Sequence, residues 1–515
     1  MENKPRLYEE LKRYVSTDYY PFHMPGHKRR LDRGITADFP NPYGIDITEI
    51  EGFDNLHHAE GIIRESMDWA AKLYGADRTY YLVNGSSGGI LSAVSGVSQT
   101  ASILMSRNCH KSVYHGVFLN RLKSRYIYPQ LIHRYGIQGG LEPEEIRNLL
   151  KAYNDISAVL VVSPTYDGIV SDIRTIAEIC HRYQIPLIVD EAHGAHFRYS
   201  EIFPVSALEL GADVVIQSVH KTLPCFTQSA ILHIKEGYIN REKIEDYLQI
   251  YQSSSPSYLL MAGIEQGIHW METKGQERMK EFSHQLLTIR SELEGMRHLR
   301  ILGKEIVGTQ GIYDMDISKI LVSTKGTEIN GTELFDRLRQ DYHLELEMCT
   351  EDYVTAITTV MDTKAGLHRL KEAFLDIDKS LERRFLYKKD KNFKEKKDSK
   401  DKNNDNRKEP KRETDKVIPQ QWKWKTEQIT TIYEAWSGEK KKVLLEESAG
   451  EVIAEFIYLY PPGIPILAPG EKITQEAVDL ILHYQKIGLP VQGMRDTMGR
   501  YVEVTASSHS EPALG

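Results

Sequence analysis

Helix-like and strand-like runs alternate from about residue 61 to about residue 236. The clearest strand-like runs are short and apolar or β-branched, and they cover 79–83, 103–105, 158–162, 186–189 and 214–217. Between them, apolar side chains recur at helical spacing over 62–74, which ends at Gly75, and over 90–97 and 173–183. Short apolar strands separated by helices are typical of parallel sheets that are buried on both faces. The pattern predicts an α/β fold with a mostly parallel sheet covered by helices on both sides.

Three polar segments directly follow strands of this predicted sheet. They are 84–88 (NGSSG), 190–193 (DEAH) and 218–221 (SVHK). Ligands of parallel α/β folds bind at the carboxyl ends of the strands, where such segments lie close together. The sequence therefore predicts one site built from all three segments.

The rest of the chain divides into segments of different composition. We expect an N-terminal arm over 1–60, a large domain over 61–275, a small α/β domain over 276–387 and a C-terminal domain over 418–515. Residues 388–417 are nearly all Lys, Asp, Glu, Asn and Arg, too polar to offset the entropy of ordering, so they predict a disordered linker. An arm that docks on nucleic acid is the alternative, which the interleaved acidic residues disfavour.

Bulk composition narrows the location and the partners. The formal net charge of −8 argues against nucleic acid as a partner and suits a cationic substrate. The four cysteines are scattered without metal-ligand spacing, which is typical of free thiols in a reducing cytosol. Because the N-terminus lacks a signal-peptide core and no stretch approaches the roughly 20 apolar residues of a membrane span, we expect a cytoplasmic protein.

Lys221 is the candidate for covalent chemistry. A lysine with a lowered pKa can hold an aldehyde cofactor as a Schiff base, and the neighbouring Ser218 and His220 give it a polar setting. An ordinary surface lysine is the alternative. Asp190 ends an apolar strand, where a carboxylate needs a partner, and a protonated pyridine nitrogen would supply one. A helix cap or a metal ligand is the alternative for Asp190.

Gly85, Ser86 and Ser87 open a predicted helix and could seat a phosphate on free backbone N–H groups, although a plain capping turn would look the same. His110 follows the strand over 103–105 and could stack on a cofactor ring or simply cap a helix. His193 and His196 carry the same ambiguity, and no third ligand completes a metal site around them. Together these residues predict a pyridoxal 5′-phosphate (PLP) site in an enzyme that acts on an amino acid.

At this point the chain resembles the Orn/Lys/Arg decarboxylase family of fold type I PLP enzymes, in the short form without an N-terminal wing domain. The resemblance rests on motifs spread over nearly the whole chain: 22–28 (FHMPGHK), 46–56 (DITEIEGFDNL), 84–88, 108–112 (NCHKS), 163–168 (SPTYDG), 190–194 (DEAHG), 218–221 with 227–229 (TQS), 460–465 (YPPGIP) and 469–471 (PGE). The charged run 388–416 matches no motif of the family.

The resemblance implies that Lys221 forms the Schiff base with PLP, Asp190 pairs with the ring nitrogen and His110 stacks on the ring. It implies phosphate binding by Ser86 and Ser87, helped by Ser218 and His220, and places His193 beside the cofactor. It further implies a homodimer or larger homo-oligomer whose active sites lie at the interface, with Ser257 and Tyr258 near the cofactor there.

The function expected from the resemblance is decarboxylation of a basic L-amino acid, with arginine favoured and lysine or ornithine open. Another fold type I reaction, such as transamination or aldol cleavage, would use the same cofactor residues. A non-catalytic PLP-binding regulator is the third possibility. Glu471 is a candidate for the acidic group that binds the distal cation of the substrate, and a helix-capping role near Thr474 is its alternative.

Overall fold

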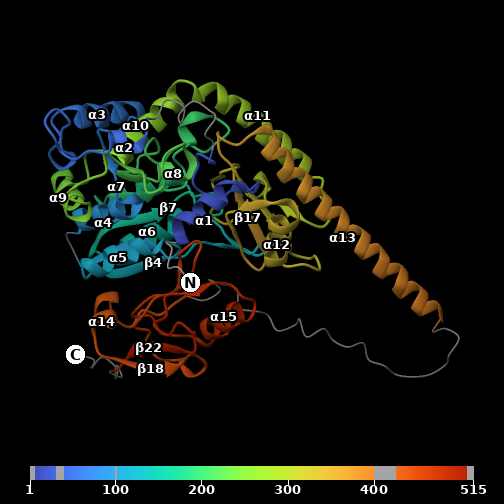
Figure 1. Ribbon diagram of the computed structural model, residues 1–515. Coiled ribbons are helices and arrows are strands. Elements are labelled where there is room, and N and C mark those ends of the chain that lie inside the picture. The colour runs from blue at the N-terminus through green and yellow to red at the C-terminus, as the bar shows by residue number, and fades with distance from the viewer. Residues whose placement is uncertain (1–5, 30–39, 99–100, 399–424, 507–515) are drawn as a thin grey trace.

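A seven-stranded sheet runs through the large domain of the computed structural model, which describes residues 6–29, 40–98, 101–398 and 425–506 (Figure 1). The strand order is β2 (Arg78–Leu82), β11 (Ala230–Ile234), β10 (Val214–Gln217), β9 (Leu187–Asp190), β7 (Ile156–Val162), β3 (Ser102–Ser106) and β4 (Lys123–Ile127). Only β11 runs antiparallel to its neighbours, and the pairs from β10 to β4 are all parallel. The predicted mostly parallel sheet is confirmed.

Helices cover both faces of this sheet, as the alternation of strand side chains requires. In β7, Val159 and Val161 join one apolar cluster, whereas Ala158 and Leu160 join another. The first face is covered by α3 (Ile62–Tyr74), α6 (Pro143–Ala152) and α7 (Ile173–Arg182), and the second by α4 (Gly85–Val97), α5 (Lys111–Leu119) and α9 (Arg241–Tyr251). Each fully buried Val, Leu or Ile stabilises the fold by about 1.5–3 kcal/mol.

Element boundaries near the site follow the local sequence. Helix α3 has the predicted bounds because Gly75, at φ +71°, forms its left-handed C-cap. Helix α4 begins at Gly85 rather than at residue 90, so Ser86 and Ser87 lie in its first turn. Short elements complete the domain: α8 (Val219–Thr222), the ribbon β5 (Leu131–Ile132) with β6 (Ile137–Gln138), and β8 (Ile169–Val170), which pairs with β13 (Asp314–Met315).

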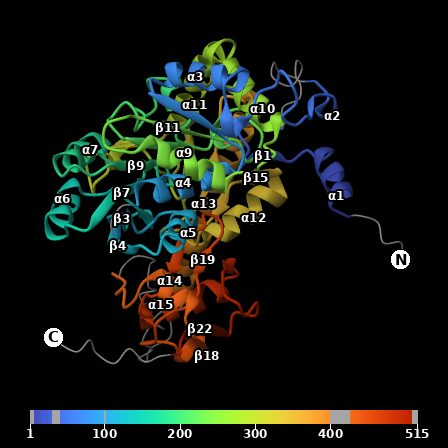
Figure 2. The ribbon, with the colours of Figure 1, turned by 90° about the vertical axis from the view of Figure 1, so that its left-hand side faces the viewer.

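The N-terminal arm reaches across to the small domain. After α1 (Arg6–Val15), which lies at the edge of the molecule in Figure 2, strand β1 (Tyr20–Phe22) pairs in parallel with β15 (Leu344–Leu346). Lys28 is buried and its Nζ donates to the carbonyl oxygens of His23 and Ile357. The short helix α2 (Pro42–Ile45) leads back to the large domain.

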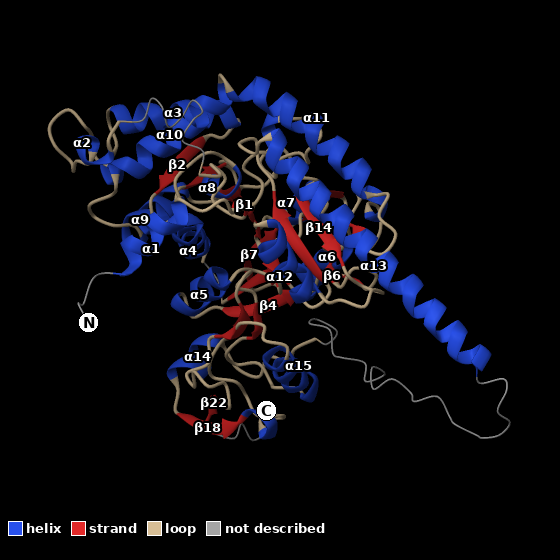
Figure 3. Ribbon diagram, turned by 45° about the vertical axis from the view of Figure 1, so that its right-hand side comes forward, coloured by secondary structure: helices blue, strands red, loops and turns tan. Residues whose placement is uncertain are grey.

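The small domain packs an antiparallel sheet against long helices. Its strands are β12 (Arg300–Ile301), β14 (Lys319–Ser323), β17 (Tyr353–Ile357) and β16 (Met348–Cys349), and its helices are α11 (Gly275–Leu293), α12 (Gly331–Tyr342) and α13 (Lys364–Asp398). Helix α10 (Tyr258–Glu272) precedes them and packs beside α3 and β2 of the large domain (Figure 1). Helix α13 extends past the body of the molecule (Figure 3) and continues to Asp398. Residues 388–398, which we expected to begin a disordered linker, continue this helix, and the rest of the expected linker lies outside the described residues.

The C-terminal domain has a core of its own and sits beside α5 and β4 (Figure 1). It contains α14 (Ile432–Ser437), β18 (Lys440–Leu444) paired with β22 (Tyr501–Thr505), the sheet β20 (Pro465–Leu467), β19 (Ile457–Leu459) and β21 (Val491–Gln492), and α15 (Gln475–Lys486). All four cysteines carry free thiols. Among the described residues, none of the helices has the length and apolar character needed to cross a bilayer.

Candidate active site

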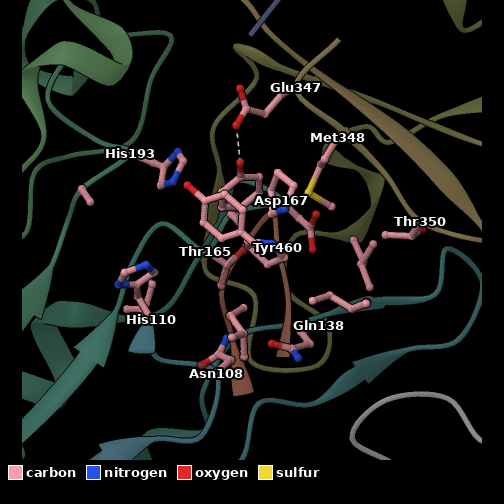
Figure 4. A pocket seen from close by; sticks show the side chains of 18 of the residues that line it. Asn108, His110, Gln138, Thr165, Asp167, His193, Glu347, Met348, Thr350 and Tyr460 are labelled. Atoms are coloured by element: carbon pink, nitrogen blue, oxygen red, sulfur yellow. Dashed lines mark hydrogen bonds between the residues drawn. The ribbon is translucent and has the colours of Figure 1, made fainter. Parts of the chain in front are cut away.

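A cavity of about 870 Å³ opens where the three domains meet. Lining residues come from the large domain, from the small domain around β16 and from the C-terminal segment 459–464 (Figure 4). Nearly all predicted cofactor residues line it: Gly85, Ser86, Ser87, His110, Asp190, His193, Ser218, His220 and Lys221. The structure therefore brings together the three polar segments that follow the strands.

Lys221 lies in the single turn of α8 with its amine facing the cavity. Its Nζ is 3.0 Å from Nε2 of His193. Burial lowers the pKa of Lys221, although the nearby Asp190 carboxylate opposes this shift. The uncharged amine is the form of lysine that attacks an aldehyde, and a lowered pKa increases its share at neutral pH. The site therefore suits a Schiff base at Lys221.

Asp190 is buried at the end of β9, with Oδ1 accepting a hydrogen bond of 3.2 Å from the Ala192 N–H. Burial raises the pKa of Asp190, while Lys221 and the Ala192 N–H act in the opposite direction. A cationic partner inside the cavity would stabilise the ionised form, which is what a protonated pyridine nitrogen provides.

The N-terminus of α4 offers a seat for a phosphate. Gly85 has φ +66°, and the first bond within the helix runs from the Gly88 N–H to the Asn84 carbonyl. The Asn84 side chain does not cap the helix; its Nδ2 donates to the Tyr251 carbonyl instead. The hydroxyl of Ser218 is buried beside the same cavity, and none of the residues that the structure describes forms a hydrogen bond with it. Free N–H groups and an orphaned hydroxyl fit a phosphorylated cofactor.

The histidines around Lys221 are held uncharged. Burial, followed by the charge of Lys221, lowers the pKa of His110 to about 3. His110 also caps α5 by accepting from the Ser112 N–H, so the capping role and the cavity-lining position coexist. Burial lowers the pKa of His220 to about 4, and its Nδ1 lies 2.8 Å from the Ser229 carbonyl. A neutral ring at His110 suits stacking on a cofactor.

His193 contacts a lysine that the sequence patterns had not singled out. Its Nδ1 is 2.8 Å from Nζ of Lys319, a fully buried residue that opens β14. The only sequence signal was a lone lysine in front of the apolar run Ile320–Val322. Glu347 was also missed: it accepts from the Met24 N–H and the Tyr166 hydroxyl, and so joins the arm, the small domain and the large domain (Figure 4).

Three residues singled out from the sequence, His196, Ser257 and Tyr258, do not line the cavity. His196 pairs with Asp316 at 3.2 Å away from the cavity lining, and the described residues contain no cluster of metal ligands. Ser257 caps α10 through the Leu260 N–H, and the Tyr258 hydroxyl donates to the Asp54 carbonyl; neither lines the cavity of a single chain. Their expected place at a subunit interface stays a prediction.

The structure does not place Glu471 at the cavity, contrary to the substrate role predicted for it. Glu471 is fully buried, and its Oε2 lies 2.9 Å from Nη2 of Arg107 and accepts from the Ala468 N–H. Its Oε1 accepts from the Thr426 hydroxyl. The N-cap of α15 is Thr474, so Glu471 does not cap this helix. Both carboxylate oxygens have partners within the protein, and the side chain neither reaches solvent nor lines the cavity.

Besides Asp190, the acidic residues that line the cavity are Asp167, Glu347, Glu351 and Asp352. Glu351 pairs with His483 at 2.8 Å and Asp352 pairs with Lys325 at 3.1 Å. Asp167 accepts from the Tyr353 hydroxyl through Oδ1, and burial raises its pKa to about 6. It is thus a buried carboxyl group at the cavity without an ion-pair partner among the described residues.

Comparison with known proteins gives a consistent result. Residues 5–331 match the model for "Orn/Lys/Arg decarboxylase, major domain", and residues 411–504 match that for "Orn/Lys/Arg decarboxylase, C-terminal domain". The chain is 30% identical to arginine decarboxylase of Bacillus subtilis (strain 168) over 98% of both chains. It is 32% identical to arginine decarboxylase of Bacillus anthracis over 95% of both.

A solved structure shares the fold. The crystal structure of the Francisella novicida lysine decarboxylase superposes with a TM-score of 0.72 at 23% identity, covering 98% of this chain and 81% of that one. The likeness confirms the predicted fold type I architecture with a C-terminal domain.

Proposed function

The chain belongs to the Orn/Lys/Arg decarboxylase family and is a PLP-dependent decarboxylase of basic amino acids, and we propose that its substrate is L-arginine. The observation that carries the choice of substrate is the similarity to arginine decarboxylases over nearly the full length of both chains. The competing readings as an aminotransferase, an aldolase or a non-catalytic regulator have no comparable support.

Lys221 would hold PLP through its Nζ, Asp190 would face the ring nitrogen, and Ser86, Ser87 and Ser218 would bind the phosphate. His110 would stack on the ring, beside His193 and His220. When bound, PLP supplies an acceptor for the electron pair that departing CO2 leaves on Cα. The buried carboxylate of Asp190 stabilises the positive charge that this acceptor needs.

Lys221 would also be placed to act as a proton donor. In its ammonium form, Nζ of Lys221 could deliver a proton to Cα after CO2 leaves and would be left as the uncharged amine. Contact with Nε2 of His193 at 3.0 Å holds the amine in position for this transfer. The C-terminal segment with Tyr460 and Pro461 lines the same cavity and limits the access of water.

Asp167 is the group that we assign to the distal cation of the substrate, in place of Glu471. It is buried, it lines the cavity, and Oδ2 has no hydrogen bond within the described part of the chain. A guanidinium beside it would repay the cost of burying an ionised carboxylate. Glu347 is less suitable because both of its oxygens already accept hydrogen bonds.

We further propose that the protein is a homodimer or a larger homo-oligomer in the cytoplasm. Its N-terminal arm exposes large apolar side chains: Leu7, Leu11, Val15, Tyr43, Ile50 and Phe53. Exposed apolar side chains gathered on one segment are typical of association surfaces. Free thiols suit a reducing compartment. The oligomeric state is tested by light scattering after size-exclusion chromatography. A monomeric mass would contradict the proposed homo-oligomer.

The substrate assignment is tested with the purified full-length protein and PLP, offered arginine, lysine and ornithine separately. We expect CO2 and agmatine from arginine, with kcat/KM well above the values for cadaverine and putrescine formation. Preferred release of cadaverine or putrescine would overturn the choice of arginine. A keto acid formed together with the amine form of the cofactor would instead indicate transamination.

A further inference from the structure

Lys319 is a fully buried lysine for which the mechanism above has no use. It opens strand β14, which continues with the buried residues Ile320 and Leu321. Its stem passes the backbone at Gly168, where a Cβ would lie 2.9 Å from Cγ of Lys319. A buried ammonium costs several kcal/mol, to order of magnitude, unless other groups compensate it. Its presence in an apolar strand therefore calls for a specific partner.

That partner is His193, which lies between two lysines from different domains. Nζ of Lys319 is 2.8 Å from Nδ1, and Nζ of Lys221 is 3.0 Å from Nε2. The ring is nearly inaccessible to solvent and packs edge-on against Tyr166. In Figure 4 the His193 ring faces the centre of the cavity. A continuous path of contacts thus joins the small domain to the amine that holds the cofactor.

The chemistry of the ring limits how these contacts can be protonated. A neutral imidazole has one N–H donor and one bare nitrogen acceptor, whereas an ammonium only donates. Burial, then the charges of Lys221 and Lys319, lowers the pKa of His193 well below its usual range, so the ring is neutral. Both contacts can be hydrogen bonds only if the lysine that faces the ring N–H is an uncharged amine, because an ammonium has no lone pair to accept that hydrogen. The other lysine donates to the bare ring nitrogen, and it can do so as an ammonium.

The surroundings decide which lysine carries the charge. Burial lowers the pKa of Lys319 to about 8, and Asp316 and Glu347 hold it from falling further, so it stays mainly cationic at neutral pH. Lys221 is the lysine that must be uncharged to bond to an aldehyde. The assignment that satisfies every atom has Lys319 donating to Nδ1 and Nε2–H donating to the amine of Lys221.

We propose that Lys319 is a positioning residue for Lys221: its ammonium fixes the His193 tautomer whose Nε2–H faces Lys221, and this keeps the Lys221 amine uncharged. The inference rests on the proposed function, because Lys221 is taken there as the lysine that holds PLP. Lys319 acts through His193 and touches neither the cofactor nor the substrate.

Other charged and titratable groups face the two lysines and contribute to their protonation. Around Lys221 they are Asp190, His110, His193, His220, Glu347 and Lys319. Around Lys319 they are Asp316, Glu347, Asp167, His193, Lys28 and Lys221. In each single variant below, only one of these groups is replaced. The effects of the unchanged groups on the pKa of Lys221 therefore cancel when a variant is compared with the native protein.

The test measures the charge of Lys221 directly in the full-length chain freed of PLP. Formaldehyde with a borane reductant methylates only uncharged amines, and peptide mass spectrometry gives the rate at Lys221 as a function of pH. In Lys319→Met we expect the profile to move to higher pH, with labelling at pH 7.5 slower by about threefold or more, because a shift of one pKa unit changes the uncharged fraction up to tenfold. An unchanged profile would overturn the proposal.

A double-mutant cycle separates the tautomer from simple charge repulsion. His193→Phe removes both ring nitrogens, so Lys319→Met in that background should move the profile much less than in the native protein. Equal shifts in both backgrounds would show that Lys319 acts by charge alone and would refute the relay. Lys319→Arg, which keeps a cationic donor, should retain a near-native profile; a shift as large as that of Lys319→Met would also refute it.

Lys28→Met serves as the matched control. Lys28 is another buried lysine, but it donates to backbone carbonyls and does not contact His193, so its loss should leave the Lys221 profile in place. If Lys319→Met does not fold, as judged by circular dichroism, the single variant His193→Phe decides: a profile moved to higher pH supports the proposal, and one unmoved or moved to lower pH opposes it. The methylation assay measures the charge of Lys221 and no decarboxylation. A negative result for Lys319 is therefore distinguishable from a failure of the protein to form agmatine.

Discussion

Arg107 and Glu471 form an ion pair with both side chains fully buried, at 2.9 Å, between the large domain and the C-terminal domain. Arg107 also donates to the carbonyl oxygens of Pro465 and Ile466. One arginine therefore fixes the C-terminal segment that leads to Tyr460 and the cavity. The pair determines how the C-terminal domain is docked, rather than which substrate is bound.

Replacing Glu471 by Gln should destabilise the protein without changing substrate affinity. The buried guanidinium of Arg107 would lose its counter-charge, at a cost of about 3–5 kcal/mol. Thermal unfolding should show a clear drop, whereas KM for arginine in the folded protein should remain near native. The exposed pair Lys472–Glu427 at 3.6 Å is the control, since Lys472→Ala should cost less than about 1 kcal/mol. A large rise in KM with native stability would restore Glu471 as a substrate ligand.

Replacing Lys221 by Ala should abolish decarboxylation and the covalent retention of PLP. Among the described residues, no other lysine occupies the position 3.0 Å from Nε2 of His193. We therefore expect activity to fall by at least about four orders of magnitude, in line with the loss of a nucleophile. Borohydride reduction followed by mass spectrometry locates the cofactor. Lys243→Ala on the exposed surface of α9 is the control. Labelling of a different lysine in the native protein would contradict the assignment.

Replacing Asp190 by Asn should leave PLP bound but slow the reaction. The amide cannot stabilise a positive ring nitrogen, and the loss of such an electrostatic group costs about 10²–10³-fold in kcat. Steady-state kinetics at saturating arginine provide the measurement, and a cofactor absorbance spectrum confirms loading. Near-native kcat in loaded Asp190→Asn would show that Asp190 has only a structural role.

Replacing Ser218 by Ala should weaken the binding of PLP. A hydrogen bond to a charged phosphate is worth about 1.5–3 kcal/mol, which corresponds to about 10–100-fold in Kd. Ser229→Ala is a matched control, because the Ser229 hydroxyl is likewise buried and has no hydrogen-bond partner within the described segments, but does not line the cavity. The prediction fails if the two variants bind PLP equally well.

The pH dependence should report Asp167. Burial raises its pKa to about 6, so the carboxyl group becomes protonated as the pH falls through 6 and no longer attracts a cation. We expect kcat/KM for arginine to decrease on the acid side with that midpoint, since kcat/KM follows ionisations of the free enzyme.

Two variants assign this inflection. Asp167→Asn should raise KM and remove the midpoint near pH 6. Tyr353→Phe should move the midpoint to higher pH, because the Tyr353 hydroxyl donates to the ionised carboxylate and favours it. An unchanged acid limb in Asp167→Asn would assign the inflection to another group.

The strand-end motifs could be read from the sequence because each depends on local geometry. Asp190 follows an apolar strand and Gly85 opens a helix, and both features are visible within a few residues. Lys319 and Glu347 could not be found in this way. Their positions depend on how the small domain packs against the large domain, over sequence separations of 126 residues between Lys319 and His193 and 181 between Glu347 and Tyr166.

Glu471 shows the opposite error. Its motif lies in the expected C-terminal domain, and an acidic residue there suited a cationic substrate. The fully buried Arg107, which neutralises it, is 364 residues away and carries no local signal of burial. Sequence motifs therefore do not predict which distant charged residues pair with each other in the folded protein.

The parallel pairing of β1 with β15 has a consequence for biosynthesis. Tyr20 is made early, yet its partner Leu344 emerges only after most of the chain has been synthesised. At about 5–20 residues per second, the arm waits on the order of tens of seconds on the ribosome before its pairing surface exists. Such a high contact order slows folding. During that interval strand β1 has no pairing partner, so its backbone donors and acceptors are satisfied by water alone until β15 is made.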